Sequence, residues 1–400
     1  MFAAVSGQGR RFLSAEHIVC RGVKSAVSDR PDPSNQSTEV EVRVCRDGDE
    51  AAKVPFLEAN MGWPATSTAV DHIEHWRWKF LSNPLGFHLV CVALHDGKVV
   101  SHSASMPVRM KIGDHTVIAS QGVDLCTHPD FRGAGLIGRT MACRNQMKDV
   151  HKVDLDFGFP NSASYKLSVT KQGFRDLGIV MLQHRYIIDG AQFFRKVRYG
   201  SIKRFGHSSY QVLRRSLGPR IDVGGGITMG SEADLGNEFD ELFERASGSF
   251  DMIIVRDSGY LRWRYCDPRA GDFVVRTVRN KGRLAGYMVM REEIKDGSRF
   301  LNIVDCLADP RSPNAVTLLL KDCISMAKSM DIETVLCCLP EGHPYGKRMT
   351  EIGFLSQVRF TGELEMKVIA LERDMGGPLM AALTKKGLRP HIMLGDTDWV

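Results

Sequence analysis

A run of small residues in the first half of the chain has the composition of an anion-binding turn. Residues 132–138 read Arg-Gly-Ala-Gly-Leu-Ile-Gly and follow an apolar segment that ends at Pro129. The residues after this run mark one face of an amphipathic helix: Leu136, Thr140, Cys143, Met147 and Val150. Glycines just before a helix N-terminus let backbone amides converge on a negative group, and the helix dipole adds favourable charge. The pattern therefore predicts a strand, a glycine-rich turn and a helix that bind a pyrophosphate.

The spacing of this turn separates it from two common phosphate-binding motifs. No Gly-Lys-Ser/Thr follows it, so it is not a Walker loop. Gly133, Gly135 and Gly138 are spaced two and three apart, which is not the Gly-x-Gly-x-x-Gly spacing of dinucleotide-binding folds. A glycine-rich turn that only packs is the structural alternative.

The elements that must position this turn occur twice in the sequence. Residues 76–80 (Trp-Arg-Trp-Lys-Phe) precede Asn-Pro, and residues 261–265 (Leu-Arg-Trp-Arg-Tyr) precede Asp-Pro. A hairpin signal follows each motif, at Asp96-Gly97 and at Lys281-Gly282. The offset is 185 residues for these features and falls to 181 or 180 for the matched pairs that follow: Asp124 with Asp305, Pro129 with Pro310, Pro160 with Pro340, Tyr165 with Tyr345, and Gly173 with Gly353. The ordered series predicts two homologous domains.

Each half is expected to fold as an α/β unit with a mixed sheet flanked by helices. We assign residues 41–189 to the first domain and 227–400 to the second, with a disordered leader at 1–40 and a basic linker at 190–226. The second domain is degenerate at the turn, because no glycine occurs between Pro310 and Ile332 and Pro313 lacks an amide hydrogen. It is therefore expected to bind no cofactor.

The first half resembles the GNAT superfamily of N-acetyltransferases. Their signature, Arg/Gln-x-x-Gly-x-Gly/Ala, is similar to residues 132–138, although Ile137 holds the sixth position and the small residue Gly138 comes one later. The strand before it ends in Thr127-His128-Pro129, where the family has Val-x-Pro. The resemblance covers residues 41–186 and extends over 227–370 as a decayed copy. The aromatic-basic motifs are similar to those of tandem bacterial members.

The resemblance implies acetyl-CoA as acyl donor, without a metal, and direct attack by an amine on the thioester. It implies that the turn amides bind the CoA pyrophosphate and that one amide of the preceding strand polarises the thioester carbonyl. The residues it assigns to the cofactor are Leu125, Cys126, Thr127, Arg132, Gly133, Ala134, Gly135, Leu136, Ile137, Gly138 and Asn161.

Direct transfer needs a base for the acceptor ammonium and an acid for the departing thiolate. The family often uses a Tyr where this chain has Val169, so Tyr165, one helical turn earlier, is the candidate acid. Asp124 and His128 share one face of a strand and are the candidate bases. Weaker options are Asp154, Asp156, the carboxylate of Val400 and, as a nucleophile, Cys126. Each has a structural alternative, since Tyr165 and Asp124 both recur in the half without the loop.

The composition indicates which class of protein this chain belongs to and which partners it is not expected to bind. The ten cysteines form no C-x-x-C pair and mostly lie in apolar runs, which favours a reducing, cytoplasmic setting over disulfides or a zinc site. The net charge of +6 is concentrated between Arg185 and Arg220, so nucleic acid is not an expected partner, and no apolar run is long enough to span a membrane. A small-molecule amine bound between the two halves is the expected acceptor. A CoA-binding sensor and a protein N-acetyltransferase are the alternatives, and the sequence carries no signal for an oligomeric state.

Overall fold

The structure is a computed structural model and describes residues 40–64, 70–188, 226–357, 366–373 and 377–398. The predicted leader and linker lie outside these ranges, apart from Val40 and Gly226. The elements of the first half are β1 (Glu41–Val44), α1 (Glu50–Met61), α2 (His72–Phe80), β2 (Leu89–His95), β3 (Lys98–Ile112), β4 (His115–Thr127), η2 (Pro129–Phe131), α3 (Leu136–Val150), β5 (Leu155–Gly158), α4 (Ser162–Lys171), β6 (Arg175–Asp176) and β7 (Met181–Ile187).

The second half repeats this order and adds a C-terminal extension. Its elements are β8 (Ile227–Ser231), α7 (Glu238–Ser247), β9 (Met252–Ile254), α8 (Ser258–Leu261), η3 (Arg262–Cys266), η4 (Pro268–Ala270), β10 (Val274–Asn280), β11 (Arg283–Lys295), β12 (Ser298–Ala308), α9 (Ala315–Ser329), β13 (Thr334–Pro340), α10 (Pro344–Glu351), β14 (Leu355–Gln357), β15 (Ile369–Glu372), α11 (Pro378–Leu383), β16 (Pro390–His391) and η6 (Leu394–Asp396).

The two predicted hairpins are confirmed. Asp96 and Gly97 have φ values of 49° and 74° between the antiparallel strands β2 and β3. Lys281 and Gly282 have φ values of 51° and 80° between β10 and β11. Two consecutive residues with positive φ are the geometry of a type I′ turn, whose twist matches that of the flanking strands. The matching turns place equivalent strands side by side in both halves.

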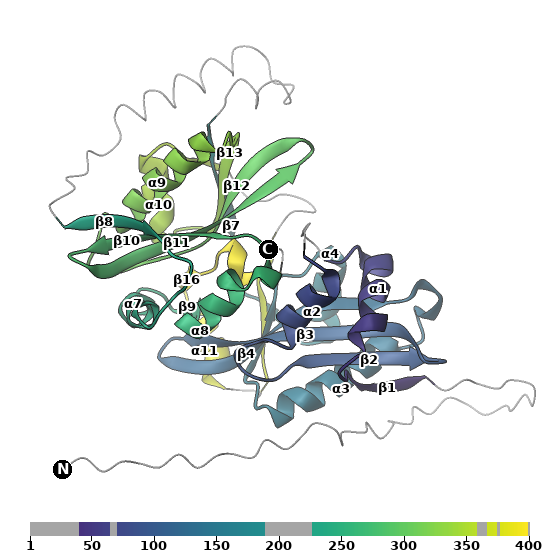
Figure 1. Ribbon diagram of the computed structural model, residues 1–400. Helices are drawn as coiled ribbons and strands as arrows, with labels where there is room; N and C mark the ends of the chain where they lie inside the picture. The colour runs from purple at the N-terminus through teal and green to yellow at the C-terminus, as the bar shows by residue number, and fades with distance from the viewer. Residues whose placement is uncertain (1–39, 65–69, 189–225, 358–365, 374–376, 399–400) are drawn as a thin grey trace, which may run out of the picture.

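Two mixed sheets form the framework, which confirms the expected α/β class (Figure 1). The first sheet has the order β1-β2-β3-β4-β5-β15-β6, with β9 on β3 and β16 on β9. The second has the order β14-β7-β13-β12-β11-β10-β8. In both sheets one central parallel pair, β4 with β5 and β12 with β13, lies among antiparallel neighbours, and the first sheet has a second parallel pair in β9 and β16.

The two halves exchange a strand, which the sequence did not predict. Strand β7 of the first half lies between β13 and β14 of the second sheet, where Met181 pairs with Pro340 and Ile187 with Thr334. Strand β15 of the second half lies between β5 and β6 of the first sheet. The alternation within a strand fixes its two faces but does not select its neighbour. The neighbour of β7 is determined by tertiary packing. For example, the ring of Tyr186 in β7 packs against Phe354 of the second half, with ring centroids 5.3 Å apart.

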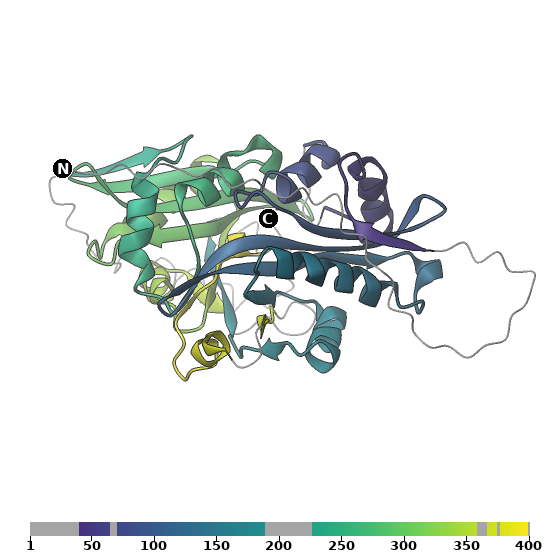
Figure 2. The same ribbon diagram turned by 90° about the horizontal axis from the view of Figure 1, so that it is seen from below.

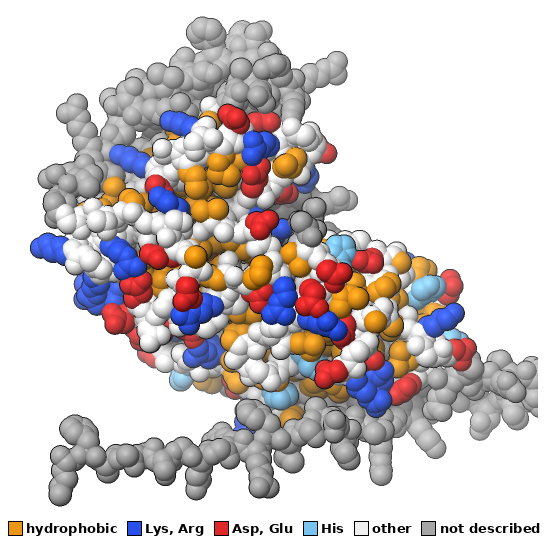
Figure 3. Space-filling view, in the orientation of Figure 1, with side chains coloured by type: hydrophobic (Ala, Val, Ile, Leu, Met, Phe, Trp, Pro, Cys, Tyr) orange, Lys and Arg blue, Asp and Glu red, His pale blue; other side chains and the backbone are white. Residues whose placement is uncertain are grey.

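Helices cover both faces of each sheet, and one apolar core runs through both halves. Helix α3 packs on β1, β2 and β3, whereas α1 packs on the other face of the first sheet; α9 and α7 take the same places on the second (Figures 1 and 2). The main cluster of buried side chains includes residues from β2 to β5 as well as from β10 to β13. Charged side chains of both signs are mixed over the face seen in Figure 3.

The repeated tryptophans meet at the junction of the halves. The rings of Trp78 and Trp263 stack with centroids 5.5 Å apart. The Nε1 of Trp78 donates to the Trp263 carbonyl at 2.6 Å, and the Nε1 of Trp263 donates to the Trp78 carbonyl at 3.0 Å. Both side chains are buried, so the two tryptophans pack the halves against each other. The reciprocal bonds mark a local two-fold relation between the halves.

Candidate acyl-CoA site

The glycine-rich turn connects β4 to α3 as predicted. Gly133 and Gly135 have φ values of 86° and 71°, a region that side chains disfavour, and Gly135 is the N-cap of α3. A Cβ at either position would meet nothing within 4 Å. The glycines are therefore required by the backbone conformation of the turn, not by crowding from the protein.

Several amides of this turn point to no acceptor within the protein. Among the described residues, no carbonyl or side-chain acceptor receives a bond from the amides of Gly133, Gly135, Leu136, Ile137 or Gly138. The first intrahelical donor of α3 is Arg139, whose amide bonds to the Gly135 carbonyl at 3.2 Å. Unpaired amides at a helix N-terminus are suited to a phosphate or pyrophosphate group.

A cavity of about 720 Å³ opens in front of these amides, between α3 and α4. Its lining combines the turn with apolar side chains of both helices and two cationic residues, and it includes Thr127, Phe131, Arg132, Gly133, Gly135, Leu136, Ile137, Gly138, Met141, Ala142, Asn145, Leu167, Lys171 and Gln172. The cavity has the size of a cofactor site. Arg132 and Lys171 add positive charge, so the residues present fit a CoA phosphate group.

The strands β4 and β5 part next to the turn. They pair in parallel from Ala119 with Leu155 to Gln121 with Phe157, after which β4 continues to Thr127 without β5 as its partner. A bulge against β3 at this point gives Asp124 a positive φ of 49°. The unpaired edge of residues 125–127 leads to the cavity and is able to pair with an extended ligand such as a pantetheine arm.

A buried charged cluster lies at the bulge. The Oδ2 of Asp124 accepts bonds from the Nζ of Lys79 at 2.9 Å and from the Nε1 of Trp63 at 3.1 Å. The carboxylate of Asp398 lies 3.8 Å from the same Nζ. The Lys79 and Asp124 side chains are only 6% and 4% exposed, so their attraction is weakly screened. Lys79 and Asp398 were not among the residues singled out in the sequence.

Two neutral histidines flank this cluster. Burial lowers the pKa of His102 to about 4, and its Nδ1 donates to the Asp124 carbonyl at 2.7 Å. Burial likewise lowers the pKa of His75 to about 4, and its ring packs against Trp63 and Trp78. Because both rings are neutral at pH 7, they add no charge to the cluster of Lys79, Asp124 and Asp398.

The structure separates the predicted acid and bases. The hydroxyl of Tyr165 donates to the Oδ2 of Asp176 at 2.9 Å, which directs it to β6. His128 is 40% exposed, and its Nδ1 accepts from the Asp130 amide at the start of η2. Asp124 alone lies at the bulge. The catalytic roles of Asp124, Tyr165 and His128 remain predictions.

The other predicted residues have clear places. Asn161 caps α4 by accepting from the Ser164 amide at 2.9 Å. Burial raises the pKa of the Cys126 thiol, which disfavours a nucleophilic thiolate. Asp156 bonds Lys148 at 2.7 Å beneath α3. Asp154 caps the start of β5 through the Ile118 amide, and Val400 lies outside the described residues.

The part of the chain that the structure describes was also considered for membrane-spanning helices and for metal sites. None of its helices combines the length and the apolar character that crossing a membrane requires. Within the same residues, no three His, Cys, Asp or Glu side chains gather in a way that could hold a metal ion.

Together the parted strands, the glycine turn and the following helix form an α/β unit with the geometry to bind an extended, phosphate-bearing cofactor. Comparison with protein families gives the same class, because residues 42–168 match the model of the acetyltransferase (GNAT) domain. The match places a GNAT acetyltransferase domain within residues 42–168. A search of curated proteins by sequence gives no match.

Solved structures share the two-sheet fold at low sequence identity. A probable N-acyltransferase of Enterococcus faecalis V583 is 14% identical, with a TM-score of 0.58 over 84% of this chain and 73% of that one. A GCN5-related N-acetyltransferase of Anabaena variabilis ATCC 29413 is 13% identical, with a TM-score of 0.56 over 83% and 72%. The N-myristoyltransferase of Saccharomyces cerevisiae with bound myristoyl-CoA is 12% identical, with a TM-score of 0.52 over 86% and 85%.

Proposed function

We propose that this protein transfers an acetyl or related acyl group from CoA to the amine of a small-molecule acceptor. The observation that carries the proposal is the set of unpaired turn amides in front of a 720 Å³ cavity, next to the point where β4 and β5 part. The solved neighbours support acyl transfer as the reaction class, through their shared fold. A cytoplasmic location is part of the same proposal and follows from the cysteine usage described above.

The chain's own residues would act by holding the donor and polarising its carbonyl. The amides of residues 132–138 would bind the pyrophosphate, and the free edge of residues 125–127 would align the pantetheine arm. An amide of this edge would stabilise the oxyanion that forms when the amine attacks. Fixing the two reactants side by side supplies a large part of the acceleration.

The second half supports one donor site per chain. In the turn between β12 and α9, a carboxylate of the chain itself, that of Asp309, binds donors of the turn. It accepts from the Arg311 amide at 2.9 Å and from the Nε of Arg245 at 2.7 Å. The Ser312 and Ala315 amides also bond to carbonyls of the same turn. These internal acceptors take the place of a phosphate, so we assign CoA to the first half alone.

The acceptor is expected at the junction of the halves, where the Asp124 and Lys79 cluster faces elements of the second half. Arg264 and Trp263 of η3 lie near this cluster, and Trp263 stacks on Trp78. The carboxylates of this cluster would be able to accept the proton that the acceptor ammonium has to lose.

A substitution at Gly135 tests the donor site. Gly135→Glu places a carboxylate among the turn amides and a side chain at a positive φ, so CoA affinity measured by calorimetry should fall at least a hundredfold. Gly282→Glu is the matched control, since Gly282 has a similar φ of 80° in open space on the β10–β11 hairpin of the second half. Equal CoA binding by Gly135→Glu and the parent would show that the loop assignment is wrong.

Turnover separates the proposal from its alternatives. Acetyl-CoA and longer acyl-CoA donors are incubated with amino sugars, amino acids, polyamines and peptides, and released CoA is followed with a thiol reagent. Turnover with a small amine supports the proposal. Turnover with peptides alone would indicate a protein acetyltransferase, and CoA binding without turnover would indicate a sensor.

A further inference from the structure

The last described residues of the chain cross from one half to the other. We call residues 390–398 the C-terminal segment. Its first part, β16, pairs in parallel with β9, which in turn pairs with β3 of the first sheet. Its second part, η6, contacts β12 of the second sheet. Figures 1 and 2 both show this yellow segment between the two halves.

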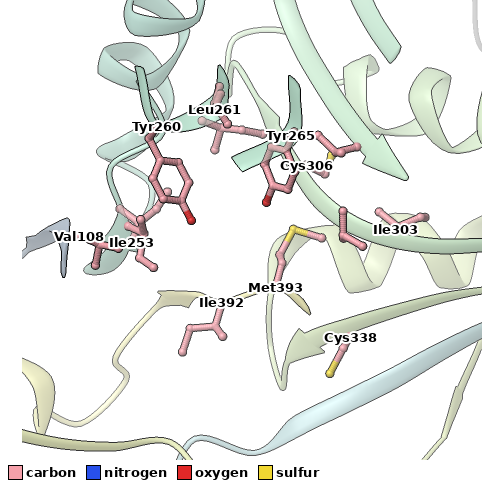
Figure 4. Close-up of a cluster of buried hydrophobic side chains, with 14 of the residues drawn as sticks. Val108, Ile253, Tyr260, Leu261, Tyr265, Ile303, Cys306, Cys338, Ile392 and Met393 are labelled. Atoms are coloured by element: carbon pink, nitrogen blue, oxygen red, sulfur yellow. The ribbon is translucent and has the colours of Figure 1, made fainter. Parts of the chain in front are cut away.

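The C-terminal segment fills the place in the second half that corresponds to the parted strands of the first. Strands β12 and β13 pair only from Phe300 with Thr334 to Ile303 with Cys337. The side chain of Met393 is fully buried and lies close to Ile303, Cys306 and Cys338, which belong to these two strands (Figure 4). The second half thus binds its own chain where the first half would bind a pantetheine arm.

Buried polar contacts hold the segment in this position. The Asp396 carboxylate accepts bonds from the Nη2 of Arg256 at 2.8 Å, and the Nε of Arg256 bonds Asp305 at 3.0 Å. Arg264 donates to the carbonyls of Gly395 at 3.1 Å and Thr397 at 2.5 Å. All these charged groups are buried, so the loss of one partner would leave a costly unpaired charge.

Close packing leaves no room for a side chain at Gly395. A Cβ there would lie 2.8 Å from the Val304 carbonyl oxygen and closer still to the Tyr265 hydroxyl. Both groups belong to the rigid core of the second half, and the Tyr265 hydroxyl also bonds Asp305 at 3.2 Å. Only a glycine at position 395 therefore allows the C-terminal segment to pack this closely against β12.

The seated segment brings Asp398 to the bulge of the first half. Its carboxylate lies 3.8 Å from the Nζ of Lys79, and its side chain is 19% exposed, against 4% for Asp124. Asp124 is tied directly to Lys79 and Trp63, whereas no side-chain donor closer than Lys79 binds Asp398 among the described residues. The charged groups that face Asp398 are Lys79 of α2, Asp124 of β4 and Arg264 of η3. Of the two carboxylates of this cluster, Asp398 has the more exposed side chain.

We propose that the second half binds the C-terminal segment in its own parted strands so that Asp398 accepts the proton of the acceptor ammonium. This inference rests on the proposed acyltransferase function. Burial and the neighbouring Asp124 raise the pKa of Asp398, which suits a proton acceptor, whereas Lys79 opposes this shift.

Acyl transfer from CoA to the amine would proceed with Asp398 as the proton acceptor. The ammonium gives one proton to the Asp398 carboxylate and becomes a neutral amine. The amine nitrogen forms a bond to the acyl carbon while the carbon–sulfur bond breaks, and the second nitrogen proton goes to the leaving thiolate. The products are the amide and free CoA, and Asp398 returns its proton to water.

The test compares Asp398→Asn and Asp398→Glu, with Asp234→Asn as a control at an exposed carboxylate that forms an ion pair with Arg262. Turnover of the best primary amine of the panel should fall about a hundredfold or more in Asp398→Asn and recover in part in Asp398→Glu. CoA affinity should not change. With hydroxylamine, which is neutral at the assay pH, the same variant should lose little, because no proton has to be removed before attack.

A second variant tests the seating of the segment. Gly395→Val should raise hydrogen exchange over residues 390–398 and lower amine turnover as much as Asp398→Asn, with CoA affinity retained. Gly236→Val is its control, because a Cβ at Gly236 meets nothing within 4 Å. Unchanged turnover and an unchanged pH profile in Asp398→Asn would overturn this inference but leave the proposed function intact. Failure of the parent to turn over any acceptor would overturn both.

Discussion

The exchange of β7 and β15 predicts that the first half cannot fold alone. A fragment of residues 40–189 keeps the turn, α3 and the cavity, but it lacks β15 between β5 and β6. Its own β7 would lose seven paired positions with β13 and three with β14. The edges of β5 and β6, which are covered in the full chain, would be exposed in the fragment.

The size of the loss follows from the side chains that β15 and its approach bury. Met366, Val368 and Ile369 are at most 4% exposed and belong to the buried side chains of the full chain. Each contributes about 1.5–3 kcal/mol when fully buried, so their removal costs about 5–9 kcal/mol before unpaired backbone groups are counted. The net stability of a domain is about 5–15 kcal/mol. The fragment is therefore expected to be unfolded or aggregated.

The assay compares three samples: the full chain, residues 40–189 alone, and residues 40–205 co-expressed with residues 206–400. Circular dichroism, thermal melting and CoA calorimetry are measured on each. The single fragment should show no cooperative melt, whereas the two co-expressed pieces should purify together and bind CoA. A cooperative melt and full CoA affinity for residues 40–189 alone would refute the role given to strand exchange.

Three further outcomes are expected. Calorimetric titration should give about one CoA per chain, and a value near two would contradict the assignment of the second half. Trp263→Phe removes the donor to the Trp78 carbonyl and should lower the free energy of unfolding by about 1–3 kcal/mol without a change in CoA affinity. Since the pKa of His102 falls to about 4 on folding, the unfolded chain binds more protons between about pH 4 and 6.5, and stability should fall as the pH is lowered through this window. His102→Gln should reduce this loss of stability by up to about 3 kcal/mol when the free energy of unfolding is compared in urea melts at pH 4.5 and 7. The same loss in the variant and the parent would contradict the lowered pKa of His102.

The local features of this fold could be predicted from the sequence because neighbouring residues determine them. Gly133 and Gly135 stand where a positive φ is required, and Asp96-Gly97 and Lys281-Gly282 form the expected turns. The helix after the turn begins at Leu136. The repeat also identified the strands that correspond in the two halves, and hence two similar sheets.

The pairing of distant segments could not be predicted in the same way. Strand β7 has the same kind of alternation whether it pairs within its own half or in the other. Lys79 lies in a motif whose tryptophans pack, so its bond to Asp124 depends on the position of α2 over β4. Asp398 lies 274 positions after Asp124 in the chain, and only the path of the C-terminal segment brings the two carboxylates to one lysine.

These long-range contacts give the degenerate half a physical role. The second half lacks the glycine turn, but it provides β15 to the first sheet and receives β7. Its parted strands bind the C-terminal segment, and Arg256 and Arg264 fix that segment through buried bonds. A second half that only filled space could diverge freely at these positions. One that completes the first sheet and positions Asp398 has to keep β12, Arg256 and Gly395 in register with the first half, because a shift in any of them would move the carboxylate away from Lys79.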